Sequence, residues 1–155
     1  MTRAYFSLGS NLGERGAHLR RGVDMMIEGE PFRVSRVYQS EPMGGVVQDD
    51  FWNLVLEVST QVSPHELLSR ARAAEAAAER TRDVRWGPRT LDVDIVWIDD
   101  VTWDDEELTV PHPRLFERNF VLVPLRELRP DLVSDERLAL ADGHVVALGT
   151  LETLH

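Results

Sequence analysis

Two carboxylates, Asp92 and Asp94, follow a loop that contains glycine, proline and several arginines. If residues 91–98 form a strand, side chains two positions apart point to the same side, so the two carboxylates converge. Paired oxygen ligands suit Mg²⁺, which takes one or two carboxylates and completes its shell with water and substrate phosphates. Guanidinium groups match phosphate oxygens, and four of them precede the carboxylates: Arg80, Arg82, Arg85 and Arg89. The combination indicates metal-assisted phosphoryl chemistry, whereas the aspartate pair alone is also typical of a solvated strand edge.

The composition narrows the classes of function. The chain has 155 residues, 43% hydrophobic and 28% charged, which is typical of one folded domain over residues 1–155. Its net charge of −10 argues against nucleic-acid binding, and no apolar stretch is long enough to span a membrane. Cysteine and lysine are both absent, so any phosphate must be held by arginine, histidine, backbone N–H groups or metal. We expect a cytoplasmic monomer.

Hydrophobic periodicity predicts the order β-α-β-β-α-β. Apolar positions after the first strand predict a helix that ends near Gly29, and Ser63 with Glu66 forms a capping box that begins a second helix. Alternating apolar residues predict four strands, at 4–8, 32–40, 51–60 and 91–98.

This order predicts an α+β, ferredoxin-like βαββαβ fold. We expect a four-stranded antiparallel sheet with helices on one face, plus a C-terminal extension that covers the other face or the edge. Two loops that contain glycine and proline, 41–50 and 80–90, flank the predicted sheet. Loops of this kind often carry function.

Alternation along the strands also assigns side chains to faces. Phe51 and Asn53 share one face of their strand, and Trp52 and Leu54 share the other. Three residues are expected to face away from the aspartate pair: Val93, Ile95 and Trp97.

Glu75 lies within the apolar stripe of the second predicted helix, which is formed by Leu67, Leu68, Ala71, Ala74 and Ala78. A carboxylate on the buried side of a helix needs a partner. An arginine just after the helix would supply one; alternatively, the small alanines leave room for Glu75 to reach solvent.

Three motifs resemble those of a known family. They are Ser7-Leu8-Gly9-Ser10-Asn11-Leu12-Gly13; Arg85-Trp86-Gly87-Pro88-Arg89 with Asp92-Val93-Asp94-Ile95; and Val110-Pro111-His112-Pro113 followed by Arg118. From Ala4 to about Val133 the chain resembles the 6-hydroxymethyl-7,8-dihydropterin pyrophosphokinases of folate biosynthesis. The resemblance implies transfer of the pyrophosphoryl group of ATP to the pterin hydroxymethyl oxygen, with release of AMP.

The resemblance implies a nucleotide side and a metal side of the site. Asp92 and Asp94 would bind two Mg²⁺ ions, which can clamp the attacking and leaving oxygens of a displacement, and Asp94 would also accept the hydroxyl proton. Arg80 and Arg89 would stabilise charge in the transition state. The residues expected to bind ATP are Glu75, Arg80, Arg82, Arg85, Trp86, Arg89, Ile95, His112 and Arg118. Without the resemblance, His112 would be interpreted as a surface histidine fixed by prolines. Trp86 is expected to close over the nucleotide; the alternative is a loop anchor buried in the core.

The resemblance also implies a pterin pocket. Phe51 and Phe120 would sandwich the ring, and Asn53 would bind its amide edge as both donor and acceptor. Backbone groups around Ser40 and Met43 would complete the pocket, beside Asp92.

The chain departs from the family pattern at Glu79, where glycine is usual, and at Glu107, where some relatives are basic. The loop after Arg82 is also one residue shorter than in some relatives. Two other functions remain open: a different Mg²⁺-dependent nucleotide transferase on the same fold, and a regulatory domain that binds a small ligand without catalysis.

Overall fold

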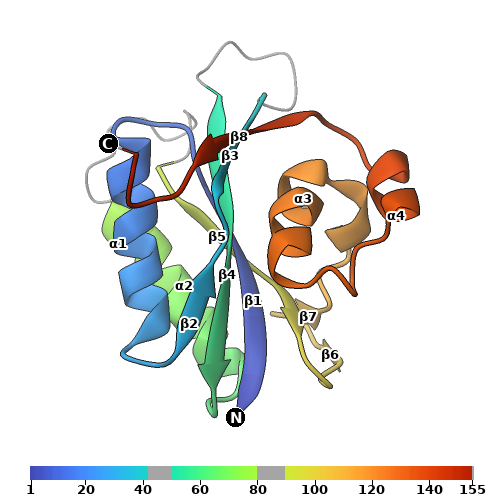
Figure 1. Ribbon diagram of the computed structural model, residues 1–155. Helices are drawn as coiled ribbons and strands as arrows, with labels where there is room; N and C mark the ends of the chain where they lie inside the picture. The colour runs from blue at the N-terminus through green and yellow to red at the C-terminus, as the bar shows by residue number, and fades with distance from the viewer. Residues whose placement is uncertain (42–49, 80–89, 155) are drawn as a thin grey trace.

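The computed structural model describes residues 1–41, 50–79 and 90–154. Its centre is a six-stranded sheet in the order β5-β1-β4-β3-β8, in which β2 also pairs with β4 (Figure 1). Every one of these strand pairs is antiparallel. The strands are β1 Thr2–Ser10, β2 Phe32–Val34, β3 Val37–Ser40, β4 Phe51–Thr60, β5 Asp92–Ile98 and β8 Val145–Gly149.

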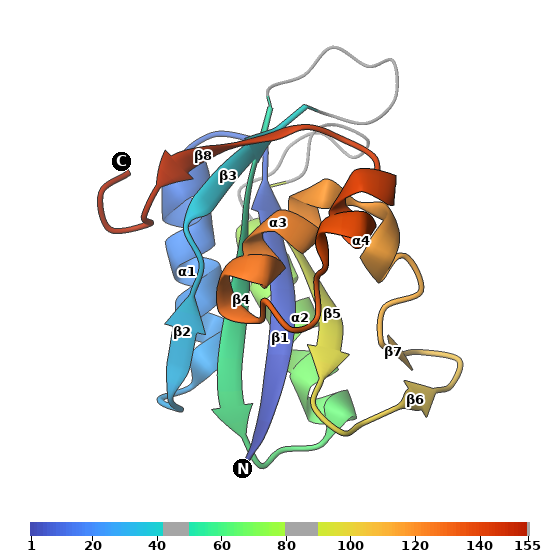
Figure 2. The same ribbon diagram turned by 45° about the vertical axis from the view of Figure 1, so that its right-hand side comes forward.

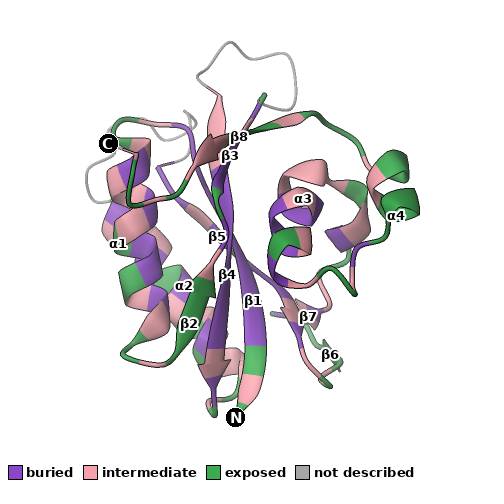
Figure 3. Cartoon of the chain, in the orientation of Figure 1, coloured by how far each residue is buried: buried purple, intermediate pink, exposed green. Residues whose placement is uncertain are grey.

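The two long strands β1 and β4 form the middle of the sheet. They pair from Thr2 opposite Thr60 to Ser10 opposite Trp52. Most of their residues are buried, as Figure 3 shows. A strand that is apolar on both faces must be covered on both, so the sheet needs a layer on each side.

Two helices, α1 (Arg15–Ile27) and α2 (Pro64–Glu79), cover one face of the sheet (Figure 1). The side-chain oxygen of Ser63 accepts a hydrogen bond of 3.2 Å from the N–H of Glu66, so the predicted start of the second helix is confirmed. In α1, a Cβ atom on Gly22 would come within 3.0 Å of the Leu8 side chain. Glycine therefore allows α1 to approach the sheet closely.

The opposite face is covered by α3 (Asn119–Leu128), which Figure 2 shows in front of the sheet. The core on this face joins apolar residues of α3 to Tyr5 and Val55. The two predicted helices share one face, as expected, but the prediction lacks α3, a third helix in the C-terminal extension that covers the other face. The sequence pattern concealed α3 because Pro124 lies inside it, and proline is unfavourable in a helix interior.

The predicted four-stranded sheet is wrong, because the sheet has six strands. The segment predicted as one strand over 32–40 is interrupted at Ser35. Its N–H donates to the Val55 carbonyl, while its side-chain oxygen accepts from the Val55 N–H, both at 2.9 Å. A side chain thus replaces the main chain at the break between β2 and β3. The sixth strand is β8, from the C-terminal segment, which pairs with β3.

A bulge in β5 corrects one predicted facing. Tyr5 pairs with Trp97, and the next residue, Phe6, pairs with Ile95, so β5 has one extra residue between them. Val93 and Ile95 pack in the core beside α1 and α2, as predicted. Trp97 instead packs against the core beside α3, because the bulge reverses the alternation.

The remaining elements are short. After β5, the strands β6 and β7 pair to form a separate two-stranded sheet. A short 3-10 helix, η1, precedes α3, and α4 follows it (Figure 2). Their bounds are β6 Trp103–Asp104, β7 Thr109–Val110, η1 Leu115–Glu117 and α4 Asp135–Leu140. Among the described residues, no helix has the length and apolar character needed to cross a bilayer.

Candidate active site

Strand register aligns the polar candidates in one row on the α3 face. Gly9 of β1 lies opposite Asp92 on one side and opposite Asn53 on the other. One step along, Ser7 lies opposite Asp94. Residues directly opposite each other in antiparallel strands point to the same face. The carboxylates predicted to bind metal and the asparagine predicted to bind the pterin therefore share a face, with only β1 between them.

Asn53 is held in one orientation by β3. It is 2% exposed, and its Nδ2 donates to Ser40 Oγ at 2.8 Å and to the Tyr38 carbonyl at 3.2 Å. A Cβ atom on Gly9 would lie 3.2 Å from Asn53 Oδ1 and 3.5 Å from the Phe51 ring. Because Gly9 has no side chain, the acceptor Oδ1 and the Phe51 ring can lie close to the main chain of β1. This arrangement suits a flat ligand that donates hydrogen bonds.

Glu75 connects α2 to the aspartate strand. Its Oε2 accepts a hydrogen bond of 3.0 Å from the backbone N–H of Val93, between the two aspartates in sequence. Burial raises the pKa of Glu75 to about 6, and the negative charges of Asp92 and Asp94 act in the same direction. The described partner of Glu75 is thus a strand N–H, an outcome that neither sequence interpretation anticipated. Three acidic groups lie near one strand end.

The donor set at this end suits Mg²⁺. Asp94 is exposed and Asp92 is half-buried, on the same side of β5. Among residues 1–41, 50–79 and 90–154, no three His, Cys, Asp or Glu side chains form a preformed metal cluster. A half-buried and an exposed carboxylate on one side of a strand match Mg²⁺ bound together with substrate phosphates, since that ion retains water and phosphate ligands.

His112 is anchored beside the aspartates. Its backbone N–H donates to the Val96 carbonyl of β5 at 3.0 Å, and its Nδ1 accepts from the N–H of Arg114 at 3.1 Å. Burial lowers the pKa of His112, Asp94 acts to raise it, and Arg118 acts to lower it. A neutral ring whose Nδ1 accepts carries its proton on Nε2, which is then a donor. His112 is therefore a half-buried donor near Asp94 and Arg118, and not a free surface histidine.

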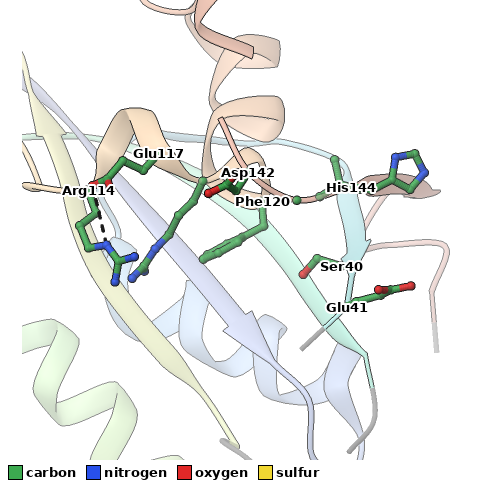
Figure 4. A pocket seen from close by; sticks show the side chains of 10 residues that line it. Ser40, Glu41, Arg114, Glu117, Phe120, Asp142 and His144 are labelled. Carbon is green, nitrogen blue, oxygen red and sulfur yellow. Dashed lines mark ion pairs between the residues drawn. The ribbon is translucent and has the colours of Figure 1, made fainter. Parts of the chain in front are cut away.

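A cavity of about 160 Å³ lies between the start of α3 and the end of β3. Figure 4 shows Phe120 and Ser40 beside it. Arg118 also lines it. The guanidinium carbon of Arg118 lies 5.6 Å from the centroid of the Phe120 ring. The first turn of α3 thus brings a cation and an aromatic face to the end of the sheet that holds Asn53 and Ser40.

Several predicted residues are placed elsewhere or lie outside the description. The Ile95 side chain is 4% exposed and belongs to the core beside α1 and α2, on the face opposite Asp92 and Asp94. Six predicted site residues lie outside the described residues: Arg80, Arg82, Arg85, Trp86, Arg89 and Met43.

Sequence reasoning missed two parts of this region. One is the place of Gly9 between Asp92 and Asn53, which its alternation with Ser7 on a polar face would have indicated. The other is the C-terminal segment at 142–145, which lines the cavity. No local pattern signals that contact, because it depends on pairing between distant parts of the chain.

Comparison with known proteins decides the family. Residues 5–130 match the family described as 7,8-dihydro-6-hydroxymethylpterin-pyrophosphokinase (HPPK). The chain belongs to the HPPK family. It is 42% identical over 128 residues to the 2-amino-4-hydroxy-6-hydroxymethyldihydropteridine pyrophosphokinase of Bacillus subtilis, covering 81% of this chain and 77% of that protein. The enzyme of the same name from Methylorubrum extorquens is 43% identical over 136 residues, covering 86% of each chain.

Some relatives are longer. The chain is 44% identical to the bifunctional protein FolKE of Lactococcus lactis over 135 residues, 83% of this chain, and it spans only 38% of that protein's length. A solved HPPK-DHPS structure from Plasmodium falciparum superposes with a TM-score of 0.61 at 14% identity, covering 83% of this chain and 42% of that one. At this identity the likeness supports the HPPK fold alone.

Proposed function

We propose that this chain transfers the pyrophosphoryl group of ATP to the hydroxymethyl group of 6-hydroxymethyl-7,8-dihydropterin, releasing AMP, in tetrahydrofolate biosynthesis. Membership of the HPPK family supports this activity. The observation that supports it in the structure is the row Asp92–Gly9–Asn53, in which the carboxylate pair and the Asn53 amide share one face. The hydroxymethyl oxygen attacks the β-phosphorus, the bond from that phosphorus to the α-phosphate oxygen breaks, and AMP leaves.

The carboxylates hold the reacting groups. Asp92 and Asp94 would hold two Mg²⁺ ions, whose chemistry when bound would be to neutralise phosphate charge in an in-line displacement. Asp94 is exposed on the α3 face and accepts the proton that the hydroxyl loses. Glu75, held by the N–H of Val93, adds negative charge behind this pair and contributes to the ATP site.

The nucleotide phosphates lie toward α3. His112 donates from Nε2 to a phosphate oxygen, and Arg118 binds a second oxygen, because charge-assisted hydrogen bonds of this kind are strong. Four arginines outside the described residues would neutralise the rest of the triphosphate, with Arg80 and Arg89 acting on transition-state charge: Arg80, Arg82, Arg85 and Arg89. Trp86, outside the described residues, and the main chain at Ile95 would complete the site around the nucleoside.

The pterin lies over Gly9. Its ring N–H and amino groups are donors and face the acceptor Oδ1 of Asn53, whose own amide hydrogens are bound to β3. Phe51 and Phe120 stack on the ring, and Ser40 borders it. Asp92 lies at the other edge, and Met43, outside the described residues, would complete the pocket.

We also propose that residues 1–155 act as one monomeric, cytoplasmic pyrophosphokinase domain. The continuous sheet from β5 to β8 supports a single domain. The net charge of −10 supports small-molecule substrates over nucleic acid.

The decisive experiment incubates the protein with ATP, Mg²⁺ and the hydroxymethyl-dihydropterin and identifies the nucleotide product. AMP together with the pterin diphosphate is the expected result. ADP would indicate a different transferase on this fold, and no nucleotide product would indicate a binding domain. A pterin with a methyl group in place of the hydroxymethyl group is the control, because it lacks the attacking oxygen and should yield no transfer product.

A further inference from the structure

The C-terminal segment 141–145, here called the strap, lines the cavity beside Phe120. The family match ends at residue 130, yet the strap supplies Asp142, Gly143, His144 and Val145 to the cavity wall. In Figure 4 the strap crosses between the start of α3 and the end of β3, while the His144 ring points away from the cavity. The His144 side chain therefore does not fill this side of the cavity.

One end of the strap is fixed to the first turn of α3. The backbone N–H of Asn119 donates to the Asp142 carbonyl, and the N–H of Asp142 donates to the Glu117 carbonyl, both at 2.9 Å. The Asn119 side chain adds two more bonds, because its Nδ2 donates to the Ala141 carbonyl at 3.2 Å and to the Gly143 carbonyl at 2.8 Å. The Asn119 side chain thus binds the strap through the residues on both sides of Asp142.

The other end of the strap is fixed to β3. Val145 pairs with Ser40 at the start of β8. Between the two anchors, Gly143 has a φ of 99°, a conformation that glycine adopts without strain. The strap therefore spans the distance between Ser40 and Phe120, the two walls of the cavity, and its length and anchorage fix that distance.

We propose that the strap sets the width of the pterin pocket and that Asn119 is the positioning residue that holds it there. The inference rests on the proposed function and adds a specificity element to the same site. Asn119 lies between Arg118 and Phe120, so the bonds that hold the strap also hold the helix turn that carries both side chains. Asn119 acts through these neighbours and touches no substrate.

The exposure of the strap separates this role from a purely structural one. Gly143 is exposed and Ala141 is half-buried, so water can replace the Asn119 amide at the stronger of the two freed bonds, that to the Gly143 carbonyl, and loss of the amide should cost little stability. Water does not, however, hold the strap in position as the Asn119 amide does. We therefore expect substitutions at Asn119 to change ligand affinity more than unfolding.

The test compares wild type with Asn119→Ala and Asn119→Asp. Asn119→Asp keeps the shape of the side chain, loses both donors, and adds a negative charge that favours a helix N-terminus. Pterin affinity is measured by calorimetry with Mg²⁺ and a non-hydrolysable ATP analogue present, and affinity for the analogue is measured alone. Ser134→Ala is the matched control, because Ser134 accepts a hydrogen bond of 3.2 Å from the Arg137 N–H and caps α4 outside the cavity lining.

Both Asn119 variants should bind the pterin about tenfold more weakly, the factor that corresponds to about 1.4 kcal/mol. Affinity of Asn119→Ala for the ATP analogue should change less, and Ser134→Ala should bind the pterin as wild type does. Wild-type pterin affinity in Asn119→Asp, or equal losses for both ligands in Asn119→Ala, would overturn the inference. A wild-type protein that forms no AMP would instead overturn the proposed function, so the two failures are distinguishable.

Discussion

At the scale of single residues, the site depends on which atoms the strands turn toward α3. Asp92 and Asp94 share that side of β5, and Asp94 is exposed, so a change of its charge leaves the core untouched. We expect Asp92→Asn and Asp94→Asn each to remove most turnover, because loss of a metal-binding carboxylate costs several kcal/mol of transition-state stabilisation. Steady-state rates at saturating Mg²⁺ are the measurement.

Asp100→Asn is the control for these variants. It removes one exposed carboxylate just beyond the other end of β5, at a φ of 58° that asparagine tolerates. Near-normal turnover in either site variant, or an equal loss in the control, would rule out the metal assignment.

Gly9 gives a second prediction at the residue scale. A methyl group at this position would come 3.2 Å from Asn53 Oδ1 and 3.5 Å from the Phe51 ring, so the Asn53 side chain would have to shift. Gly9→Ala should therefore weaken pterin binding by roughly 1–3 kcal/mol, since the ligand's donors lose their acceptor. Calorimetry with each substrate tests this. Affinity for the ATP analogue should stay near the wild-type value, and an equal loss for both ligands would point to general distortion.

Glu75 predicts a pH dependence of stability. Burial raises its folded-state pKa to about 6, above its value in the unfolded chain, so the folded protein binds the proton more tightly. The stability that protonated Glu75 provides is present at low pH and is lost as the pH rises toward about 6. Glu75→Gln keeps an oxygen acceptor for the Val93 N–H. Because glutamine does not titrate, the variant does not lose stability as the pH rises.

Between pH 4.5 and 7.5, the free energy of unfolding of Glu75→Gln, measured with urea, should rise relative to wild type by roughly 1 kcal/mol. This is about half the value that the full pKa shift would give, because Glu75 is partly exposed. A difference that does not vary with pH would mean that Glu75 is not buried as described.

At the scale of elements, a polar network fixes α3 to the sheet far from the site. Buried Glu57 of β4 accepts from Tyr5 Oη at 2.6 Å and from Arg33 through two bonds of 2.9 and 2.6 Å. Arg33 also donates to the carbonyl of Leu128 at the end of α3. Hydrogen bonds from Arg33 lower the pKa of Glu57 in the folded protein. The stability that ionised Glu57 provides is therefore present above the pKa of Glu57 in the unfolded chain and is lost as the pH falls through its folded-state pKa.

Arg33→Ala should lower the free energy of unfolding by about 2 kcal/mol at neutral pH, because it leaves a buried carboxylate with fewer partners. Arg126→Ala is the matched control, since Arg126 pairs at 2.7 Å with Asp135, whose side chain is 88% exposed. An exposed pair of this kind contributes roughly 0–1 kcal/mol. Equal losses in the two variants would show that the Glu57 network does not anchor α3.

At the scale of the whole molecule, two apolar cores, one on each face of the sheet, hold the fold. We therefore expect chelation with EDTA alone to leave the melting temperature unchanged. Mg²⁺ and an ATP analogue together, at about 100 times the dissociation constant, should raise it by roughly 5–10 °C. Thermal unfolding followed by fluorescence is the measurement. A fall in melting temperature with EDTA alone would reveal a structural metal.

The sequence by itself determined the elements whose signals are local. Strand β4 runs over Phe51–Thr60 as alternation predicted, and α2 begins after Ser63 as its capping residue predicted. Alternation also placed Asp92 and Asp94 on one side, and Phe51 with Asn53, because neighbouring residues fix side-chain direction within a strand. The motif resemblance indicated the family for the same reason: its motifs are short and continuous.

Only the tertiary structure decided which distant segments lie together. Three features depend on contacts with segments that are distant in the sequence. They are the break at Ser35, the bulge before Trp97 and the position of α3 on the second face of the sheet. The hydrogen bonds from Asn119 to the strap join residues more than twenty positions apart in the sequence. Pairing of this kind depends on the shape and unsatisfied hydrogen bonds of both segments at once, so neither segment's own pattern contains it.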